Sequence, residues 1–220
     1  MADLKSSKIV FLDDRVSGYT SIEDEYGFTI MHSWEDPQMK KHAEVVCRNG
    51  GDILEIGFGM GISATYIQHQ NIKSHTIIEI HPVIARKARE WAKDKPNVII
   101  IEADWYDVVD DLKTYDGIFY DPDPLPYCDP NMRKFPKFVK EKLLKDKGIF
   151  SFYNTITNDT NKSNGIKLRN NILKRFFIKN NKVEYITMDI EPPISEDENS
   201  RYFSPSDKKY NLPFIIQDKR

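Results

Sequence analysis

The chain has 220 residues, of which 40% are hydrophobic, and this is enough for one sizeable core within the usual size of a single domain. The formal net charge is −2, so a broad basic surface of the kind that binds nucleic acid or anionic membranes is not expected. The N-terminus has no apolar leader pattern, and no run approaches the ~18 apolar residues that a membrane span needs. We therefore expect a cytoplasmic protein with no nucleic-acid and no membrane partner.

The first predicted helix follows a polar N-terminal arm. Asp36-Pro37 has the composition of an N-cap followed by the first helical residue, and the pair Gly50-Gly51 ends the helix. Four apolar side chains share one face of it, at Met39, Ala43, Val46 and Cys47.

Short apolar runs then alternate with helical patterns. The runs with the length of strands are at 53–56, 75–80, 98–102, 117–120 and 148–153. The helical patterns are near 61–69, 82–93, 105–112, 136–145 and 164–175. Two late strand signals, 183–190 and 212–216, are expected to form an antiparallel hairpin at the edge of the sheet.

This alternation predicts an α/β, Rossmann-like fold. We expect a mostly parallel seven-stranded sheet with helices on both faces and a C-terminal antiparallel hairpin. The ligand is expected at the carboxyl ends of the strands. The Lys-rich stretch 133–147 is interpreted as the solvated face of an amphipathic helix rather than as a nucleic-acid patch, because apolar residues recur in it at helical spacing.

The two cysteines, Cys47 and Cys128, form no C-x-x-C pattern and lie beside no histidine at metal-ligand spacing. No metal site is expected. The simplest interpretation is that Cys47 packs on the inner face of a helix and that Cys128 lies free in a loop, with a nucleophilic Cys128 as the alternative.

A glycine-rich motif, Glu55-Ile56-Gly57-Phe58-Gly59-Met60-Gly61, follows a predicted strand and opens a helix. Glycines there let the backbone turn sharply and approach a ligand closely. Position 62 is Ile, so the third glycine of the dinucleotide pattern G-x-G-x-x-G is missing. The form E-x-G-x-G-x-G is typical of class I methyltransferases, in which this loop wraps the amino-acid part of S-adenosylmethionine.

Two more acids end the next two predicted strands. Glu79 lies 22 residues beyond Gly57, close to the spacing expected for a carboxylate that accepts hydrogen bonds from both ribose hydroxyls. Asp104 precedes Trp105, and an acceptor there could take the adenine amino group while an aromatic side chain covers the ring. Three such acids in order predict S-adenosylmethionine as the cofactor and S-adenosylhomocysteine as its product.

Three further segments carry a resemblance to a known family. Met31-His32-Ser33-Trp34-Glu35-Asp36-Pro37-Gln38-Met39, followed by the glycine motif, resembles guanidinoacetate N-methyltransferase, whose family has M-x-x-W-E-T-P-Y-M and then V-L-E-V-G-F-G-M at the same separation. Tyr115-Asp116-Gly117-Ile118-Phe119-Tyr120-Asp121 and Arg201-Tyr202 match as well. The resemblance runs from about Ile30 to the C-terminus, and it includes the arginine N-methyltransferase 2-like domain.

The resemblance implies roles for particular residues. Glu35 would pair with a substrate guanidinium, and Asp121 would bind the reacting nitrogen and remove its proton. Met31 and Met39 would line the cofactor pocket. The full predicted cofactor site is Met31, Met39, Glu55, Gly57, Phe58, Gly59, Met60, Gly61, Ile62, Ser63, Glu79, Ile80, His81, Asp104, Trp105 and Asp121. The predicted substrate-binding residues are Glu35, Asp121, Asp123, Asn154 and Thr155.

The chain departs from the family where the acceptor is expected. The family's Y-D-T-Y-P-L becomes Tyr120-Asp121-Pro122-Asp123-Pro124-Leu125, and Asn154-Thr155 replaces an N-L-T sequence. The run from Asp121 to Pro124 also resembles the D-P-P-Y-like turn of amino-group methyltransferases. The acceptor is therefore expected to be a small molecule or peptide with a guanidino group, arginine- or guanidinoacetate-like, or another cationic nitrogen.

Other interpretations of the same residues stay open. Glu35 could simply occupy the start of a helix, where a carboxylate is favoured, and Asp121 could be a turn former before Pro122. The acceptor could be an amine, carboxylate or hydroxyl, or the chain could bind the cofactor without catalysis as a partner protein. An aminopropyltransferase of the spermidine synthase kind uses a similar sheet. We expect an N-terminal arm or lid over residues 1–29, a methyltransferase domain over 30–220, and a possible homodimer.

Overall fold

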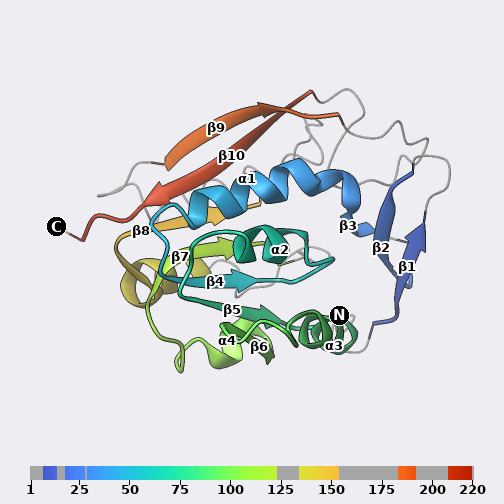
Figure 1. The fold of residues 1–220 in the computed structure, drawn as a ribbon, viewed down its shortest axis with the longest axis horizontal. Helices are drawn as coiled ribbons and strands as arrows, with labels where there is room; N and C mark the ends of the chain where they lie inside the picture. The colour runs from blue at the N-terminus through green and yellow to red at the C-terminus, as the bar shows by residue number, and fades with distance from the viewer. Residues whose placement is uncertain are drawn as a thin grey trace.

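A seven-stranded sheet forms the centre of the computed structural model, which describes residues 7–13, 18–27, 29–122, 134–153, 183–191 and 208–219. The strand order is β6-β5-β4-β7-β8-β10-β9 (Figure 1). The strands are β4 (Asp52–Ile56), β5 (Ser74–Glu79), β6 (Val98–Glu102), β7 (Tyr115–Tyr120), β8 (Leu144–Phe152), β9 (Val183–Asp189) and β10 (Lys209–Ile216).

The first five strands of this sheet pair in parallel, and β10 is antiparallel to both β8 and β9. Strand β4 lies in the middle, with all five of its residues buried, which explains why its sequence is a continuous apolar run apart from the two acids Asp52 and Glu55. The predicted fold class, including the C-terminal antiparallel hairpin, is confirmed.

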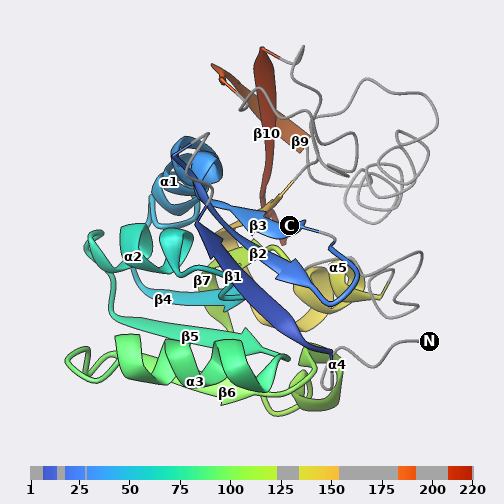
Figure 2. The ribbon, with the colours of Figure 1, turned by 90° about the vertical axis from the view of Figure 1, so that its right-hand side faces the viewer.

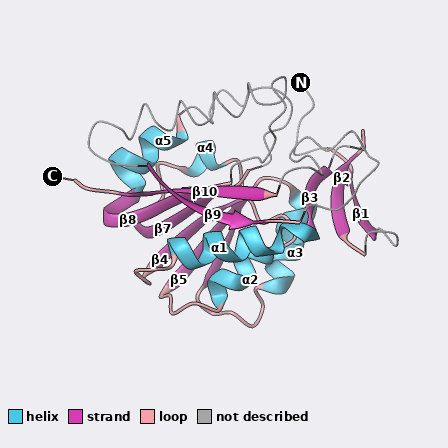
Figure 3. Ribbon diagram, turned by 90° about the horizontal axis from the view of Figure 1, so that it is seen from above, coloured by secondary structure: helices cyan, strands magenta, loops and turns pink. Residues whose placement is uncertain are grey.

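Helices cover both faces of the sheet (Figures 2 and 3). One face carries α1 (Asp36–Val46), α2 (Ile62–Gln68) and α3 (Pro82–Trp91). The other carries α4 (Trp105–Val108) and α5 (Phe135–Phe138), which continues into the π-helical turn η2 (Val139–Leu143). Apolar side chains fill both layers, in one cluster that includes residues of α1 and another that includes residues of α4, α5 and η2. Among the described residues, no helix combines the length and hydropathy needed to cross a membrane.

Helix α1 is fixed to the sheet by a buried polar relay. Ser151 of β8 donates to the carbonyl of Pro213 in β10 at 2.7 Å, so its oxygen accepts from His42 Nδ1 at 2.8 Å. His42 Nε2 in turn lies 2.8 Å from the hydroxyl of Tyr210, which donates to it. The relay joins α1, β8 and β10, and therefore holds the C-terminal hairpin against the helix.

A second, three-stranded antiparallel sheet precedes α1. It consists of β1 (Ile9–Asp13), β2 (Thr20–Asp24) and β3 (Thr29–His32), and the 3-10 turn η1 (Ser33–Glu35) links it to α1. It stands at the end of the main sheet to which the parallel strands point (Figures 1 and 3). Strand β3 begins at Thr29, at the predicted limit of the N-terminal arm, and the division into arm and domain remains a prediction.

Several element bounds differ from those expected. Helix α4 has one turn, 105–108, where 105–112 was expected, because the chain turns at 109–111. The helix expected at 136–145 ends at 143, because Leu144 pairs with Tyr115 of β7 and begins β8. Asp36 is the first residue of α1 rather than its N-cap, which is Glu35. The helix expected at 164–175 and Cys128 lie outside the described residues.

The amino edge of the sheet is held by a network of ion pairs. Lys113 lies 2.8 Å from a carboxylate oxygen of Asp52, and Lys145 lies 3.2 Å from Asp52 and 2.7 Å from Asp116. Hydrogen bonds from Lys113, and then from Ser74, hold the pKa of Asp52 well below its usual range. This edge is opposite to the one at which the ligand is expected. We therefore expect the network to stabilise the fold rather than to bind a ligand.

Candidate active site

The glycine loop between β4 and α2 is packed closely against two other segments. Gly57 has φ +91°, and a Cβ on it would lie 2.4 Å from the carbonyl oxygen of Asp121. Gly59 has φ +53°, and a Cβ on it would lie 2.6 Å from the sulfur of Met31. At Gly57 the neighbour is a backbone atom, so only glycine fits both the conformation and the contact; at Gly59 the positive φ favours glycine, and a Cβ would displace the Met31 side chain. The loop is therefore built to sit directly between the end of β7 and strand β3.

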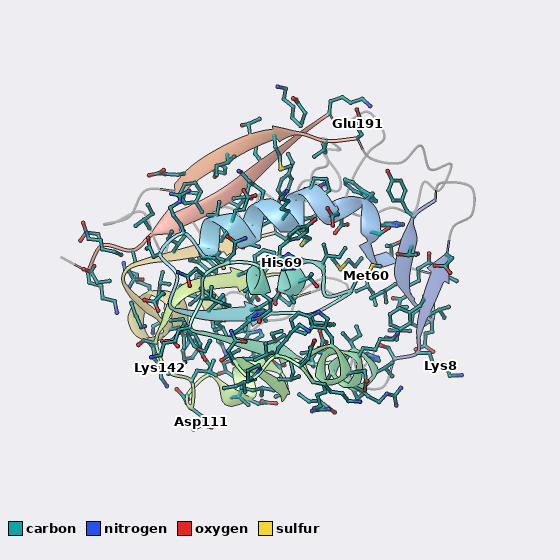
Figure 4. All side chains as sticks on the ribbon, in the orientation of Figure 1. Lys8, Met60, His69, Asp111, Lys142 and Glu191 are labelled. Atoms are coloured by element: carbon teal, nitrogen blue, oxygen red, sulfur yellow. The ribbon has the colours of Figure 1, made fainter. Side chains whose placement is uncertain are left out.

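Methionines from three segments gather at this loop. The amide of Met60 lies 3.2 Å from the sulfur of buried Met31, and Figure 4 shows Met60 at the end of the main sheet that faces β3. Met39 of α1 is wholly buried in the same apolar cluster, against which Met60 packs. Met31 thus contacts the loop and Met39 shares its apolar cluster, and their role in a cofactor pocket stays a prediction.

The carboxylate of Glu79, at the end of β5, is surrounded by backbone donors. It accepts hydrogen bonds from the amides of Phe58 and His81, each at 2.8 Å, and a further one from the amide of Gly59. Burial raises the pKa of Glu79, and these three backbone hydrogen bonds partly oppose that shift. Glu79 therefore fixes the glycine loop in place while lying at the ligand edge of the sheet.

The carboxylate of Glu55 points into the protein. It accepts a hydrogen bond from the Ser63 hydroxyl, and its other oxygen lies 2.9 Å from His75 Nε2, with the Glu55 and His75 side chains wholly buried. These contacts join the start of the loop to α2 and β5. Cys47, the C-cap of α1, is buried in the apolar cluster, in agreement with the predicted packing role; burial, and next the charge of Glu55, raise the pKa of its thiol to about 12.

His81 and Ile80 follow Glu79 at the same edge. His81 Nδ1 accepts from the amide of Val83 at 3.2 Å and so caps α3, while His81 Nε2 donates to the carbonyl of Ser7 at 2.9 Å. The ring is therefore held on both sides. Ile80 is half-buried beside it.

Asp104 and Trp105 begin α4. A carboxylate oxygen of Asp104 accepts from the amide of Tyr106 at 2.9 Å, which makes Asp104 the N-cap of this helix. Trp105 is buried, and its ring packs edge-on against Phe135 with centroids 4.8 Å apart. The indole thus contributes to the core on this face of the sheet. Ile62, also predicted in the cofactor site, is half-buried at the first position of α2 behind Gly61.

The two predicted catalytic acids lie on the same edge. Asp121 directly follows β7, and its amide donates to the carbonyl of Ile56 at 2.9 Å, next to Gly57. Glu35 is buried at the N-terminus of α1. The neighbouring Asp36 accepts from the Tyr66 hydroxyl of α2 at 2.9 Å, which fixes this end of the helix. The three other predicted substrate residues, Asp123, Asn154 and Thr155, lie outside the described residues.

Sequence reasoning missed Gln38, which is wholly buried on α1 one helical turn after Glu35. Its spacing from Glu35 was the available signal, because side chains three residues apart share a helix face. Its burial could not be read from the sequence.

Comparison with known proteins identifies the family. The family model for guanidinoacetate N-methyltransferase matches residues 19–209. Protein arginine N-methyltransferase 2 from Aspergillus oryzae is 35% identical over 157 residues, which are 67% of this chain and 35% of the relative. Its namesake from Candida glabrata is 37% identical over 141 residues, 59% of this chain and 33% of the relative. The chain thus spans about a third of the length of these curated relatives.

Solved structures of low sequence identity share the fold. Spermidine synthase from Thermotoga maritima superimposes with a TM-score of 0.69 at 15% identity, over 96% of this chain and 69% of that one. Precorrin-6y C5,15-methyltransferase from Geobacter metallireducens gives 0.58 at 16% identity, over 82% of this chain and 88% of that one. The fold is thus compatible with more than one chemistry, and the sequence motifs decide between them. This chain belongs to the guanidinoacetate N-methyltransferase family, a family of methyltransferases, as its motifs predicted.

Proposed function

We propose that this chain transfers a methyl group from S-adenosylmethionine to a guanidino nitrogen of a small molecule or peptide. The observation that carries the proposal is the contact between Gly57 and Asp121, in which the candidate base adjoins the candidate cofactor loop. Family membership supports the reaction class, and the name of the arginine N-methyltransferase relatives supports a guanidino acceptor.

The residues at this edge fit S-adenosylmethionine. The loop lies against the carbonyl oxygen of Asp121 at Gly57 and against the sulfur of Met31 at Gly59, so three segments predicted to contact the cofactor adjoin one another. Glu79 supplies a buried carboxylate at the end of β5, where ribose hydroxyls would find acceptors. Bound there, the cofactor would supply an electrophilic methyl group on a positively charged sulfur.

The two acids would bind and activate the acceptor. A guanidinium is planar and can form paired, charge-assisted hydrogen bonds with a carboxylate, so Glu35 and Asp121 together would set its orientation. A guanidinium nitrogen has no free lone pair until it loses a proton. We propose that Asp121 accepts that proton as the nitrogen–carbon bond forms and the carbon–sulfur bond breaks. The products are a methylated guanidinium that keeps its single positive charge, neutral S-adenosylhomocysteine and a protonated Asp121 carboxyl.

The enclosure of these groups favours this reaction over methylation of an anion. Glu35 is buried and Asp121 is half-buried, so both carboxylates lie in a region of low dielectric. A negatively charged acceptor placed between them would be repelled by both. A cation placed there would neutralise their charge. The geometry therefore favours a cationic acceptor, and a carboxylate acceptor is disfavoured.

The proposal is tested by measuring S-adenosylhomocysteine formation with guanidinoacetate, L-arginine, an arginine peptide and the matched lysine peptide. We expect turnover with at least one guanidino compound, and we expect Asp121→Asn to lower kcat, measured at saturating S-adenosylmethionine, by about 10²–10⁴-fold. The control is Asp111→Asn, which removes an exposed carboxylate outside the site, labelled in Figure 4. Cofactor binding without turnover on any acceptor would support a non-catalytic role instead.

A further inference from the structure

One buried side chain near this edge has an unmet hydrogen-bonding capacity. Gln38 of α1 is 0% exposed, and among the residues that the structure describes neither its amide oxygen nor its amide nitrogen has a hydrogen-bond partner. A buried primary amide that bonds to nothing is destabilising, and such groups are uncommon in folded proteins. A molecule bound at this edge of the sheet would supply such a partner.

The packing of α1 on the sheet gives the level at which Gln38 lies. Val46 is opposite Gly117, since a Cβ on Gly117 would meet the Val46 carbonyl at 2.1 Å, and His42 stacks on Phe119 with ring centroids 4.6 Å apart. One step of four residues along the helix thus matches one step of two residues along β7. This agrees with the axial rise of about 6 Å for four helical residues and about 6.6 Å for two strand residues.

A further four residues along the helix, from His42 to Gln38, correspond to a further two residues along the strand, from Phe119 to Asp121. Gln38 is therefore level with Asp121, at the carboxyl end of β7. Glu35 precedes Gln38 by three residues, which places both on one face of the helical segment. An uncharged amide is thus one helical turn from Glu35 and level with Asp121, the two acids that would bind the acceptor.

We propose that Gln38 is a substrate-binding residue that makes the site selective for a guanidinium over an ammonium group. Its amide oxygen accepts an N–H of the acceptor that Glu35 and Asp121 hold. This inference rests on the proposed function, since it names a further contact in the same site.

The number of donors explains the selectivity. An arginine-like guanidinium presents five N–H donors, and two carboxylates that each accept in paired fashion satisfy four of them. The fifth needs another acceptor, and a neutral amide provides one without adding a third negative charge next to a single positive charge. An ammonium group has three donors, which the two carboxylates can already satisfy. Loss of the Gln38 amide should therefore affect guanidino acceptors and spare amines.

The test uses Gln38→Met, which keeps the length of the side chain and removes the amide, in the full chain. We expect KM for L-arginine or guanidinoacetate, whichever wild type methylates better, to rise about 10- to 100-fold, the range for a lost hydrogen bond to a charged group. KM for S-adenosylmethionine should stay unchanged. The thermal midpoint of the protein without acceptor should rise, because an unsatisfied buried amide has been removed. Gln38→Glu, which retains an acceptor oxygen, should keep KM for the guanidino acceptor closer to that of wild type.

Gln217→Met is the matched control. Gln217 is also buried, but its amide nitrogen donates to the carbonyls of Leu144 and Lys140 at 3.0 and 3.2 Å. This variant should lower the thermal midpoint and leave KM for the acceptor unchanged. An unchanged acceptor KM in Gln38→Met would overturn the inference and would mean that water or nothing satisfies the amide. A wild-type protein that methylates no guanidino compound would instead refute the proposed function, and this inference with it.

Discussion

Replacement of Gly57 by Ala tests the close contact on which the site depends. Two effects add at this position. Gly57 has φ +91°, which costs an L residue about 1–2 kcal/mol. The new Cβ would also lie 2.4 Å from the carbonyl oxygen of Asp121, a backbone atom that cannot rotate away. Overpacking of this kind typically costs about 1–3 kcal/mol. We therefore expect a loss of about 2–5 kcal/mol in the free energy of unfolding.

Gly27→Ala is the matched control for Gly57→Ala. Gly27 has φ +76°, but a Cβ there would meet nothing within 4 Å, so only the conformational term of about 1–2 kcal/mol applies. Urea unfolding measures both variants, and calorimetric titration with S-adenosylhomocysteine shows whether displacement of Asp121 weakens the loop as a binding site. Equal destabilisation of the two variants, with equal affinity for S-adenosylhomocysteine, would refute the reasoning.

Three further predictions concern buried polar groups. Asp52→Asn should destabilise the protein at pH 7, because Lys113 holds the pKa of Asp52 low in the folded state. The stability that this pair contributes is present above the unfolded pKa of ~3.9 and is lost as the pH falls below that value. The difference between Asp52→Asn and wild type in urea unfolding should therefore shrink at low pH. Glu79→Gln should weaken S-adenosylhomocysteine binding at least tenfold, about 1.4 kcal/mol, in calorimetric titration, because an amide cannot accept on both sides from the converging backbone donors. An undiminished affinity would show that Glu79 is not a ligand. Tyr210→Phe should cost about 1–3 kcal/mol in thermal or urea unfolding, since it leaves His42 Nε2 buried and unbonded, and a stability equal to wild type would contradict the relay.

The central strands β4, β5 and β7 were predictable because they are buried along nearly all their length. Every residue of β4 is buried, so its sequence is a short apolar run that ends in glycines, and the next strand, β5, repeats that pattern before Glu79. A short continuous run of apolar residues indicates a strand that is buried on both faces of the sheet. The positions of Glu79 and Asp104 near successive strand ends followed from the alternation of strand and helix patterns along the sequence.

The N-terminal sheet was not predictable from the same kind of signal. Four of the five residues of β1 are exposed, among them Val10, Phe11 and Leu12 at 40–46%. An exposed strand shows no alternation of buried and exposed residues along its sequence. Strand β1 is instead held by its pairing with β2, and that pairing depends on the register of the two strands rather than on their composition. The arm was therefore treated as a polar segment, although its strands β1 and β2 form a sheet with β3, the strand that carries Met31 to the glycine loop.

The direction of site side chains was only partly predictable. The sequence places Glu35 and Asp121 at the ends of elements, and the fold brings those ends to one edge. It does not reveal that Glu55 points inward to Ser63 and His75, since this depends on how α2 and β5 pack around it. The full burial of Gln38 likewise depends on how α1 packs on the sheet.

The central claim is that a methyl group passes from S-adenosylmethionine to a guanidino nitrogen. The most direct measurement is incubation with S-adenosylmethionine carrying a carbon-13 methyl group and an arginine peptide or guanidinoacetate, followed by tandem mass spectrometry of the acceptor. The account predicts one labelled methyl group on a guanidino nitrogen for each S-adenosylhomocysteine released, and loss of both in Asp121→Asn. Label on an amine, carboxylate or hydroxyl with the guanidino group unmodified would contradict it.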